Sequence, residues 1–188
     1  MFELVADEEV RLRPLSYREV PELYRLTDLY RDHLSTWLPW VRRHTLTDTY
    51  AFVDHSIAQQ RRNEGFQAGI FYRHAIVGVI GYHKIDWDNR KTSLGYWLIP
   101  TVQGRGVMSR ACSAMLDYAF FHLGLNRMEI RAAKDNIRSR RVAERLGFTQ
   151  EGIIRQAEWL HDRFVDHVVY GLLAREWEQR SDRRAFFA

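Results

Sequence analysis

The sequence predicts a single α/β domain whose sheet is partly parallel and is covered by helices on both faces. Its 188 residues suit one domain. Strand-like and helix-like segments alternate along the chain, and no repeat or linker interrupts them. Between residues 91 and 133 a strand, a helix and a second strand follow one another. Such a β-α-β unit indicates a sheet that is partly parallel and covered on both faces.

The expected order of elements is β-α-α-β-β-β-α-β-α-β-β. A capping box of Ser16 and Glu19 opens the first helix, and Thr47 is expected to cap the second. Gly124 and Gly147 end the two later helices. Strands are expected at residues 10–13, 66–72, 75–87, 91–98, 127–133, 149–159 and 164–173, and helices at residues 16–30, 47–63, 106–124 and 139–146.

Composition narrows the function only weakly. The net charge is +4, from 28 Lys and Arg against 24 Asp and Glu. This excess suits a polyanionic ligand such as a nucleotide phosphate, an acidic protein or a nucleic acid, but charge alone favours the simpler explanation of a solvated surface. No interleaved aromatic and basic motif is present, so direct nucleic-acid binding is not expected.

Cysteine and histidine usage argues against metal chemistry. A single cysteine, Cys112, excludes an intrachain disulfide and an all-thiolate metal site. The eight histidines lack metal-ligand spacing, so no metal is expected. The chain starts without a signal peptide and has no apolar stretch long enough to span a bilayer. We therefore expect a cytoplasmic protein without membrane contact.

Residues 103–108 (Q-G-R-G-V-M) form the candidate phosphate-binding loop between a strand and a helix. A helix N-terminus exposes backbone N–H groups and a partial positive charge. Gly104 and Gly106 let this backbone approach a pyrophosphate closely, and Arg105 adds a cation. No lysine follows as in a Walker A loop, and Ser109 replaces the third glycine of a dinucleotide fingerprint. A turn without any ligand is the alternative.

The loop also resembles the coenzyme A loop of the GNAT superfamily, Q/R-x-x-G-x-G/A. Gln103 and Gly106 match it, whereas Met108 stands in place of the small last residue. Four further segments follow the family's order: W-L-P-W at 37–40, L-G-Y-W-L at 94–98, D-N-x-x-S at 135–139 and Q-A-E-W-L at 156–160. The ordered set is similar to the RimL/RimJ group of ribosomal-protein-serine (alanine) acetyltransferases.

This resemblance implies a GNAT fold over residues 1–188, with a mixed, mostly antiparallel sheet and a central splayed parallel strand pair. It implies acetyl-CoA as co-substrate. The pantetheine arm is expected to enter between strands 92–98 and 127–133 as an added strand would. The implied cofactor-binding residues are Trp97, Leu98, Gln103, Gly104, Arg105, Gly106, Val107, Met108, Asn136 and Ser139.

By the same match, Glu158 is the general base and Ser139 the general acid of a direct acetyl transfer within a ternary complex. A base must neutralise the amine and an acid must protonate the leaving thiolate. Without the family match, the sequence favours Glu158 as a surface residue paired with an arginine, and Ser139 as a helix N-cap. Ser93 stands where many relatives carry a glutamate.

The acceptor is the least determined part of the prediction. The rigid aromatic turn of Trp37, Pro39 and Trp40 is expected to border the acceptor site. The resemblance points to the N-terminal α-amine of a ribosomal protein such as the stalk protein, and it leaves a homodimer open. Two alternatives remain: an acetyltransferase for a small amine (a polyamine or an antibiotic), and a coenzyme A-binding sensor without turnover.

Overall fold

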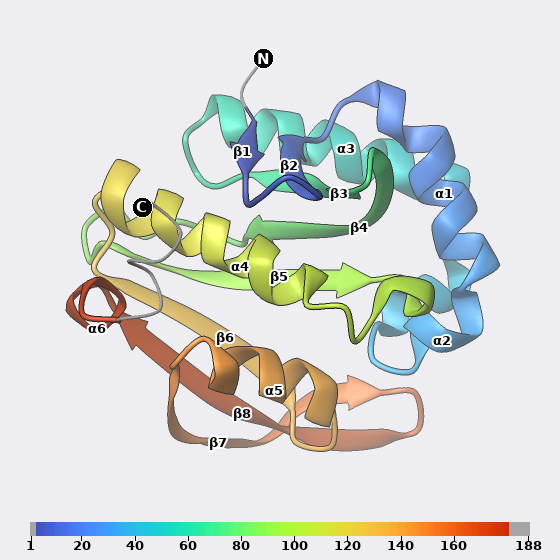
Figure 1. The fold of residues 1–188 in the computed structure, drawn as a ribbon. Coiled ribbons are helices and arrows are strands. Elements are labelled where there is room, and N and C mark those ends of the chain that lie inside the picture. Colours follow the sequence, from blue (N-terminus) through green and yellow to red (C-terminus); the bar gives the residue numbers. More distant parts are fainter. Residues whose placement is uncertain (1–2, 181–188) are drawn as a thin grey trace.

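The computed structural model describes residues 3–180 and contains one continuous eight-stranded sheet (Figure 1). The strand order is β1-β2-β3-β4-β5-β6-β8-β7. The predicted alternation of strands and helices is confirmed, with additional short elements at both ends. The strands are β1 (Leu4–Val5), β2 (Val10–Pro14), β3 (Gln67–Tyr72), β4 (Ala75–Tyr82), β5 (Lys91–Leu98), β6 (Arg127–Ala133), β7 (Thr149–Leu160) and β8 (Arg163–Leu173).

Six α-helices flank the sheet, and α4 and α5 lie on the face nearest the viewer in Figure 1. The paired helices α1 and α3 cover the other face of the N-terminal half. Within residues 3–180 no helix has the length and apolar character needed to cross a membrane. The helices are α1 (Val20–Leu29), α2 (Arg31–Ser35), α3 (Leu46–Arg61), α4 (Val107–Asp117), α5 (Ile137–Arg145) and α6 (Ala174–Glu178).

The sheet is antiparallel except between β5 and β6, which confirms the expected central parallel pair. The β5–β6 register runs from Lys91 opposite Arg127 to Ser93 opposite Glu129. Beyond Ser93 the two strands separate towards their C-terminal ends (Figure 1). The remaining backbone of each strand therefore borders the widening gap between them.

The apolar periodicity of the sequence corresponds to the observed core. In β4 every residue after Ala75 is buried, as expected for a strand covered on both faces. Helix α4 buries Val107, Ala111, Cys112 and Met115, a spacing that places them on one side of a helix. This helix continues as a π-helical turn before Gly124, which adopts a φ of 66°.

Several predicted boundaries need correction. Thr47 does not cap α3: Thr45 does, and its hydroxyl and backbone N–H form a capping box with Asp48. An aspartate replaces the usual Glu or Gln of that motif, which hid the signal. The predicted strand 75–87 ends at Tyr82 because the chain turns back at an Asp86–Lys91 bridge. Neither β1, α2 nor α6 was expected, since each spans five residues or fewer.

Candidate active site

The predicted phosphate loop joins the end of β5 to the first turn of α4. Gly104 and Gly106 have φ values of 77° and 73°, in the left-handed region. A Cβ atom built at either position would meet nothing within 4 Å. The backbone conformation, and not lack of space, therefore requires glycine here. The open space above both residues leaves the loop backbone accessible to a ligand.

The two residues after Gly106 anchor the loop to the core. Val107 and Met108 are 1% and 8% exposed. Their side chains point into the protein, while their backbone N–H groups belong to the helix turn that lacks preceding carbonyl partners. Met108 in place of a small residue is thus accommodated by the core and does not block the loop.

Gln103 has a structural role that the sequence did not reveal. Its Nε2 donates to the carbonyl of Leu98 at 3.0 Å and lies 3.1 Å from Nε2 of His33. Its Oε1 accepts a hydrogen bond from Arg138 at 2.7 Å. One side chain therefore ties together the end of β5, helix α2 and the first turn of α5. Its direct contact with the cofactor stays a prediction.

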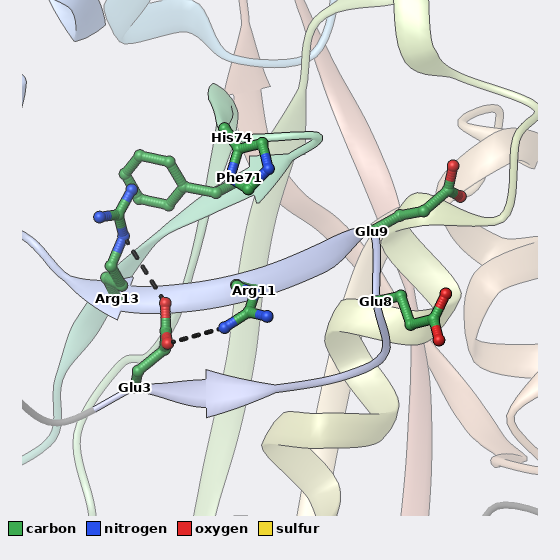
Figure 2. Close-up of a pocket in the computed structure, with 7 residues that line it drawn as sticks. All are labelled: Glu3, Glu8, Glu9, Arg11, Arg13, Phe71 and His74. Carbon is green, nitrogen blue, oxygen red and sulfur yellow. Dashed lines mark hydrogen bonds and ion pairs between the residues drawn. The ribbon is translucent and has the colours of Figure 1, made fainter.

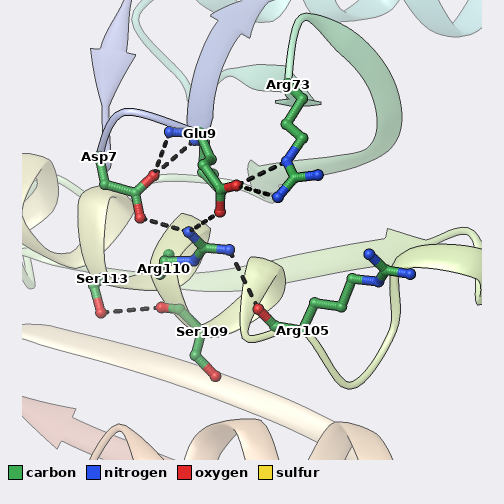
Figure 3. A network of polar contacts seen from close by, with 8 residues as sticks. Asp7, Glu9, Arg73, Arg105, Ser109, Arg110 and Ser113 are labelled. Carbon is green, nitrogen blue, oxygen red and sulfur yellow. Dashed lines mark hydrogen bonds and ion pairs between the residues drawn. The ribbon is translucent and has the colours of Figure 1, made fainter.

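The side chains of Arg105 and Arg110 differ in their contacts at this loop (Figure 3). The exposed side chain of Arg105 extends away from the protein network, but its carbonyl accepts a hydrogen bond from Arg110 at 3.2 Å. Arg110 also pairs with Asp7 at 2.7 Å and with Glu9 at 3.2 Å. The β1–β2 turn is thereby fastened to the loop, a connection between residues about a hundred positions apart.

This network perturbs the acidic groups in it. Partial burial alone would raise the pKa of Asp7, but hydrogen bonds from Arg110 and from the backbone of Val10 and Glu9 lower it overall. Hydrogen bonds from Arg73 and Arg110 likewise lower the pKa of Glu9. Both carboxylates therefore stay charged down to lower pH than usual.

Trp97 and Leu98 lie in the part of β5 that has separated from β6. They pair on the other side with Val79 and Gly78 of β4. Leu98 is buried and Trp97 partly buried. The backbone of both residues therefore borders the gap, and their contacts with pantetheine remain predictions.

Ser139 sits in the first turn of α5, but Asn136 is the residue that caps this helix. The side-chain oxygen of Asn136 accepts the N–H of Ser139 at 3.2 Å, so the interpretation of Ser139 as the cap is wrong. The Ser139 hydroxyl lies 3.3 Å from the hydroxyl of Tyr96, which also donates to the Ser139 carbonyl. Desolvation raises the pKa of Tyr96 well above its ordinary value, so this phenol keeps its proton.

Glu158 has a histidine as its partner. The alternative interpretation of Glu158 as a surface residue predicted an arginine instead. Its Oε2 lies 3.0 Å from Nε2 of His167 on β8, and both side chains are partly buried. Glu158 pairs directly with Val165 in the β7–β8 hairpin, whose turn lies at 161–162 as predicted. His167 was missed, although counting outward from this turn places it diagonally across from Glu158.

The two candidate pairs lie on opposite faces of the sheet. His167 pairs with Ala133 on β6, and the same face continues through Glu129 to Ser93 on β5. Tyr96 is three residues from Ser93 and so points to the other face, where it meets Ser139 of α5. The widening β5–β6 gap separates the Glu158–His167 pair from the Ser139–Tyr96 pair.

The predicted aromatic turn borders the Glu158 face. Trp37 packs against Ala133, Leu160 and Val165. Trp40 is 46% exposed and meets His44 edge-on, and Pro39 begins the short 3₁₀ helix between α2 and α3. The structure thus brings the Trp37 turn to the hairpin that carries Glu158.

Polar contacts fix the same turn against the hairpin. His161 at the hairpin tip lies 2.6 Å from the carbonyl of Ser35, and Arg42 approaches the other nitrogen of this ring at 3.3 Å. These contacts join helix α2 and the Trp37 turn to the strand pair β7–β8. Segments more than a hundred residues apart in the chain therefore form one wall of the candidate acceptor site.

A second histidine on this face was also missed. Nδ1 of His83 lies 2.9 Å from the hydroxyl of Ser93, and its ring covers Gly95 so closely that a Cβ there would overlap it. Desolvation and the charge of Arg131 lower the pKa of His83, which favours the neutral imidazole. His83 therefore stands as a second potential proton acceptor beside the gap.

Cys112 is fully buried in α4, and burial raises the pKa of its thiol far above the ordinary value. Its interpretation as a core residue, and not as a nucleophile, is supported. Among residues 3–180 no group of three or more His, Cys, Asp or Glu side chains is placed to hold a metal ion.

The hollow in Figure 2 lies on the outer part of the sheet, away from these features. It has a volume of about 280 Å³ and includes none of the predicted site residues. Glu3 pairs with Arg11 at 3.3 Å, and the Arg13 guanidinium stacks 3.5 Å above the Phe71 ring. Glu3 also lies 3.9 Å from Arg13, and Glu9 pairs with Arg73 and Arg110 outside the hollow, so most of its charges belong to structural ion pairs.

Comparison with known proteins identifies the family. The model of the acetyltransferase (GNAT) domain matches residues 9–149, about three quarters of the chain. This chain belongs to the GNAT acetyltransferases. Glu158 and His167 lie beyond the matched segment.

Several relatives of this GNAT acetyltransferase span almost the whole chain. A putative ribosomal N-acetyltransferase of Bacillus subtilis, YdaF, is 35% identical and covers 95% of this chain and 98% of its own. The ribosomal-protein-serine acetyltransferase of Escherichia coli is 30% identical over 87% of this chain and 92% of its own. A solved RimL structure, a ribosomal L7/L12 α-N-protein acetyltransferase in complex with coenzyme A, has a TM-score of 0.88 at 27% identity, covering 92% and 98%.

Proposed function

We propose that this GNAT acetyltransferase transfers acetyl from acetyl-CoA to the N-terminal α-amine of a ribosomal protein, with both substrates bound together. The observation that carries the proposal is the Glu158–His167 pair, which lies on the face bordered by the Trp37 turn. The Ser139–Tyr96 pair occupies the opposite face, next to α5. A proton acceptor and a proton donor thus flank the gap from two sides.

On the donor side, the accessible backbone of residues 104–108 binds the pyrophosphate, and the helix N-terminus favours its negative charge. The exposed guanidinium of Arg105 adds a positive charge. The separated backbone of Trp97 and Leu98 accommodates the pantetheine arm as an added strand. Acetyl-CoA supplies the activated acetyl group, and the chain supplies position. The RimL neighbour in complex with coenzyme A supports this arrangement.

On the acceptor side, Glu158 takes the proton from the α-amine, directly or through one water. An α-amine has a pKa of about 7.7–8.0 and a lysine about 10.4. Neutralisation at pH 7 therefore costs about 1 kcal/mol for the α-amine against about 4–5 kcal/mol for lysine. A single carboxylate meets the smaller demand. Ser139, held by Tyr96, protonates the sulfur that leaves as a thiolate.

Two relatives favour a ribosomal protein as the acceptor, and a third supports the alternative of a small amine. Two relatives at 30% identity or more carry ribosomal names. The spermidine N(1)-acetyltransferase of Escherichia coli is 25% identical over 84% of this chain. Ribosomal acetylation would place the enzyme in the cytoplasm. The single domain and a homodimer stay predictions.

Mass spectrometry tests the acceptor. The enzyme is incubated with labelled acetyl-CoA and, separately, with ribosomal protein L7/L12, spermidine and an aminoglycoside. We expect one label on the L7/L12 N-terminus. Label on internal lysines, or fast acetylation of spermidine with unlabelled L7/L12, would assign the small-amine function. Absence of turnover together with acetyl-CoA binding in calorimetry would indicate a sensor.

A further inference from the structure

The β7–β8 hairpin contains an irregularity immediately before Glu158. Ile154 pairs with His167, and Glu158 pairs with Val165. The chain thus takes four steps along β7, from Ile154 to Glu158, while β8 takes two, from His167 to Val165. Residues 155–157 hold the surplus and form a bulge. Bulges of this kind bend a strand and re-aim a nearby side chain.

The hairpin turn and the bulge have different effects on the register. Counted from the turn, Leu160 pairs with Arg163 and Glu158 with Val165, so regular pairing would place Gln156 opposite His167. The bulge interrupts this order, and Ile154 pairs with His167 instead. Because the surplus is an even number of residues, Ile154, Glu158 and His167 share one face of the sheet. The bulge therefore takes Gln156 out of its place opposite His167, and the ring contacts the Glu158 carboxylate at 3.0 Å.

The bulge is built on a strained residue. Gln156 has a φ of 50°, in the left-handed region that a side chain with a Cβ rarely adopts. Such a conformation persists where surrounding contacts hold it. Here the backbone N–H of Gln156 donates to the Asp166 carboxylate at 2.9 Å.

Asp166 is well placed to act as this anchor. Its own carbonyl accepts the N–H of Lys134 at 2.9 Å, which ties it to the end of β6. Its neighbours on β8 are Val165, the direct partner of Glu158, and His167, the hydrogen-bond partner of the carboxylate. One residue therefore connects the bulge to both contacts that locate Glu158.

We infer that Asp166 and the Gln156 bulge are a positioning device that holds His167 and Glu158 in contact. The inference rests on the proposed role of Glu158 as the base. Asp166 and Gln156 are positioning residues, because they act through the position of the carboxylate.

A double-mutant cycle tests the inference, with turnover measured on the acceptor that wild-type enzyme acetylates. Asp166→Ala removes the anchor and should lower kcat by about 10-fold or more, because small misplacements of reacting groups are costly. The KM for acetyl-CoA should not change. In a Glu158→Gln background the same substitution should have no further effect on kcat. An equal loss in both backgrounds would overturn the inference.

Three variants separate positioning from general destabilisation. Asp166→Asn keeps an oxygen acceptor for the Gln156 N–H and should restore most of the activity. Gln156→Gly relieves the backbone strain while keeping the N–H, so it should retain kcat and raise Tm. Asp162→Ala removes a carboxylate from the same hairpin outside the bulge and should behave as wild type. Full activity in Asp166→Ala would overturn the inference.

A second readout does not depend on Glu158 being the base. The imidazole nitrogen NMR shifts of His167 report its contact with Glu158. We expect Asp166→Ala to move these shifts in the same direction as Glu158→Gln does. If Glu158→Gln keeps full activity but both variants move the shifts, the base assignment fails and the positioning device stands. If the His167 shifts do not change in Asp166→Ala, the inference that Asp166 positions Glu158 is wrong.

Discussion

The donor side of this enzyme is formed mainly by backbone, and the acceptor side mainly by side chains. The donor loop depends on backbone: two left-handed glycines create it, and the buried side chains of Val107 and Met108 hold it to the core. The acceptor side depends on side chains: Glu158 contacts His167 on the edge hairpin, and Trp37 packs against the same hairpin. A site made of backbone depends on the conformation of the chain, whereas a site made of side chains depends on the residues at each position. The fold therefore determines the donor and leaves the acceptor to local residues.

Glu158→Gln tests the separation of the donor and acceptor sides, and we expect it to have the largest effect on kcat. Removing a general base should lower kcat by about 10²–10⁴-fold. Acetyl-CoA affinity should not change, because Glu158 lies on the face opposite the donor side. Steady-state kinetics and calorimetry measure the two quantities.

Glu151→Gln is the matched control on the same strand, since Glu151 pairs with Arg127 and not with His167. It should keep near wild-type kcat. If Glu158→Gln is as active as wild type, His83 becomes the candidate base. His83→Gln should then produce the large loss instead.

Ser139→Ala should have a smaller effect, about 10-fold on kcat. Water can protonate a departing thiolate whose pKa is about 8.5, so the lost hydroxyl is partly replaced. Tyr96→Phe removes the phenol 3.3 Å from this hydroxyl and should cost no more than Ser139→Ala. A loss in Tyr96→Phe that greatly exceeds that in Ser139→Ala would make Tyr96 the proton donor.

Much of the fold on both sides could be predicted from sequence, because it depends on residues that are close together in the chain. The glycine loop, β5, β6 and the hairpin turn follow from residue periods and turn residues, and the structure has β5 and β6 with the predicted bounds. Glu158 and Ser139 were singled out by motif alone. The structure adds a partner for each, His167 and Tyr96, and for both roles the tests remain to be done.

The missed features are those made by pairing across the chain. His167 meets Glu158 only through the hairpin register, and Arg110 meets Asp7 only after about a hundred intervening residues fold. The Gln156 bulge also leaves no sign in the residue pattern, since no glycine marks its positive φ. Short elements such as α2 were missed because five residues are too few to show a helical periodicity.

Gly106→Ala probes the backbone character of the donor side. Alanine has room for its Cβ there but must adopt a φ of 73°, which costs about 1–2 kcal/mol. The KM for acetyl-CoA should rise by up to about 10-fold as the loop relaxes, since 1.4 kcal/mol is a factor of ten. Gly152→Ala is the control, because Gly152 also has open space but no positive φ. An unchanged KM in Gly106→Ala would contradict the backbone argument.

Arg105→Ala should have a weaker effect on the same side. The exposed side chain contributes a solvent-screened charge, so we expect the KM for acetyl-CoA to rise a few-fold with kcat nearly constant. The increase should shrink at high salt. Loss of kcat without a change in KM would show that Arg105 acts on the chemistry and not on binding.

The smallest effect concerns the Arg110 network beneath the loop. Asp7 has a lowered pKa in the folded protein, so its charged form stabilises the fold above its unfolded pKa of about 3.9. Asp7→Asn should therefore lower the free energy of unfolding at pH 7 by at most about 1 kcal/mol. This difference should disappear as the pH falls through the folded-state pKa, because wild-type Asp7 then becomes neutral. Urea unfolding at a series of pH values from 7 downward, to below the folded-state pKa, measures both ends, with the exposed Asp88→Asn as control. A difference that persists below that pKa would mean that Asp7 supports the loop through shape and hydrogen bonding, and not through its charge.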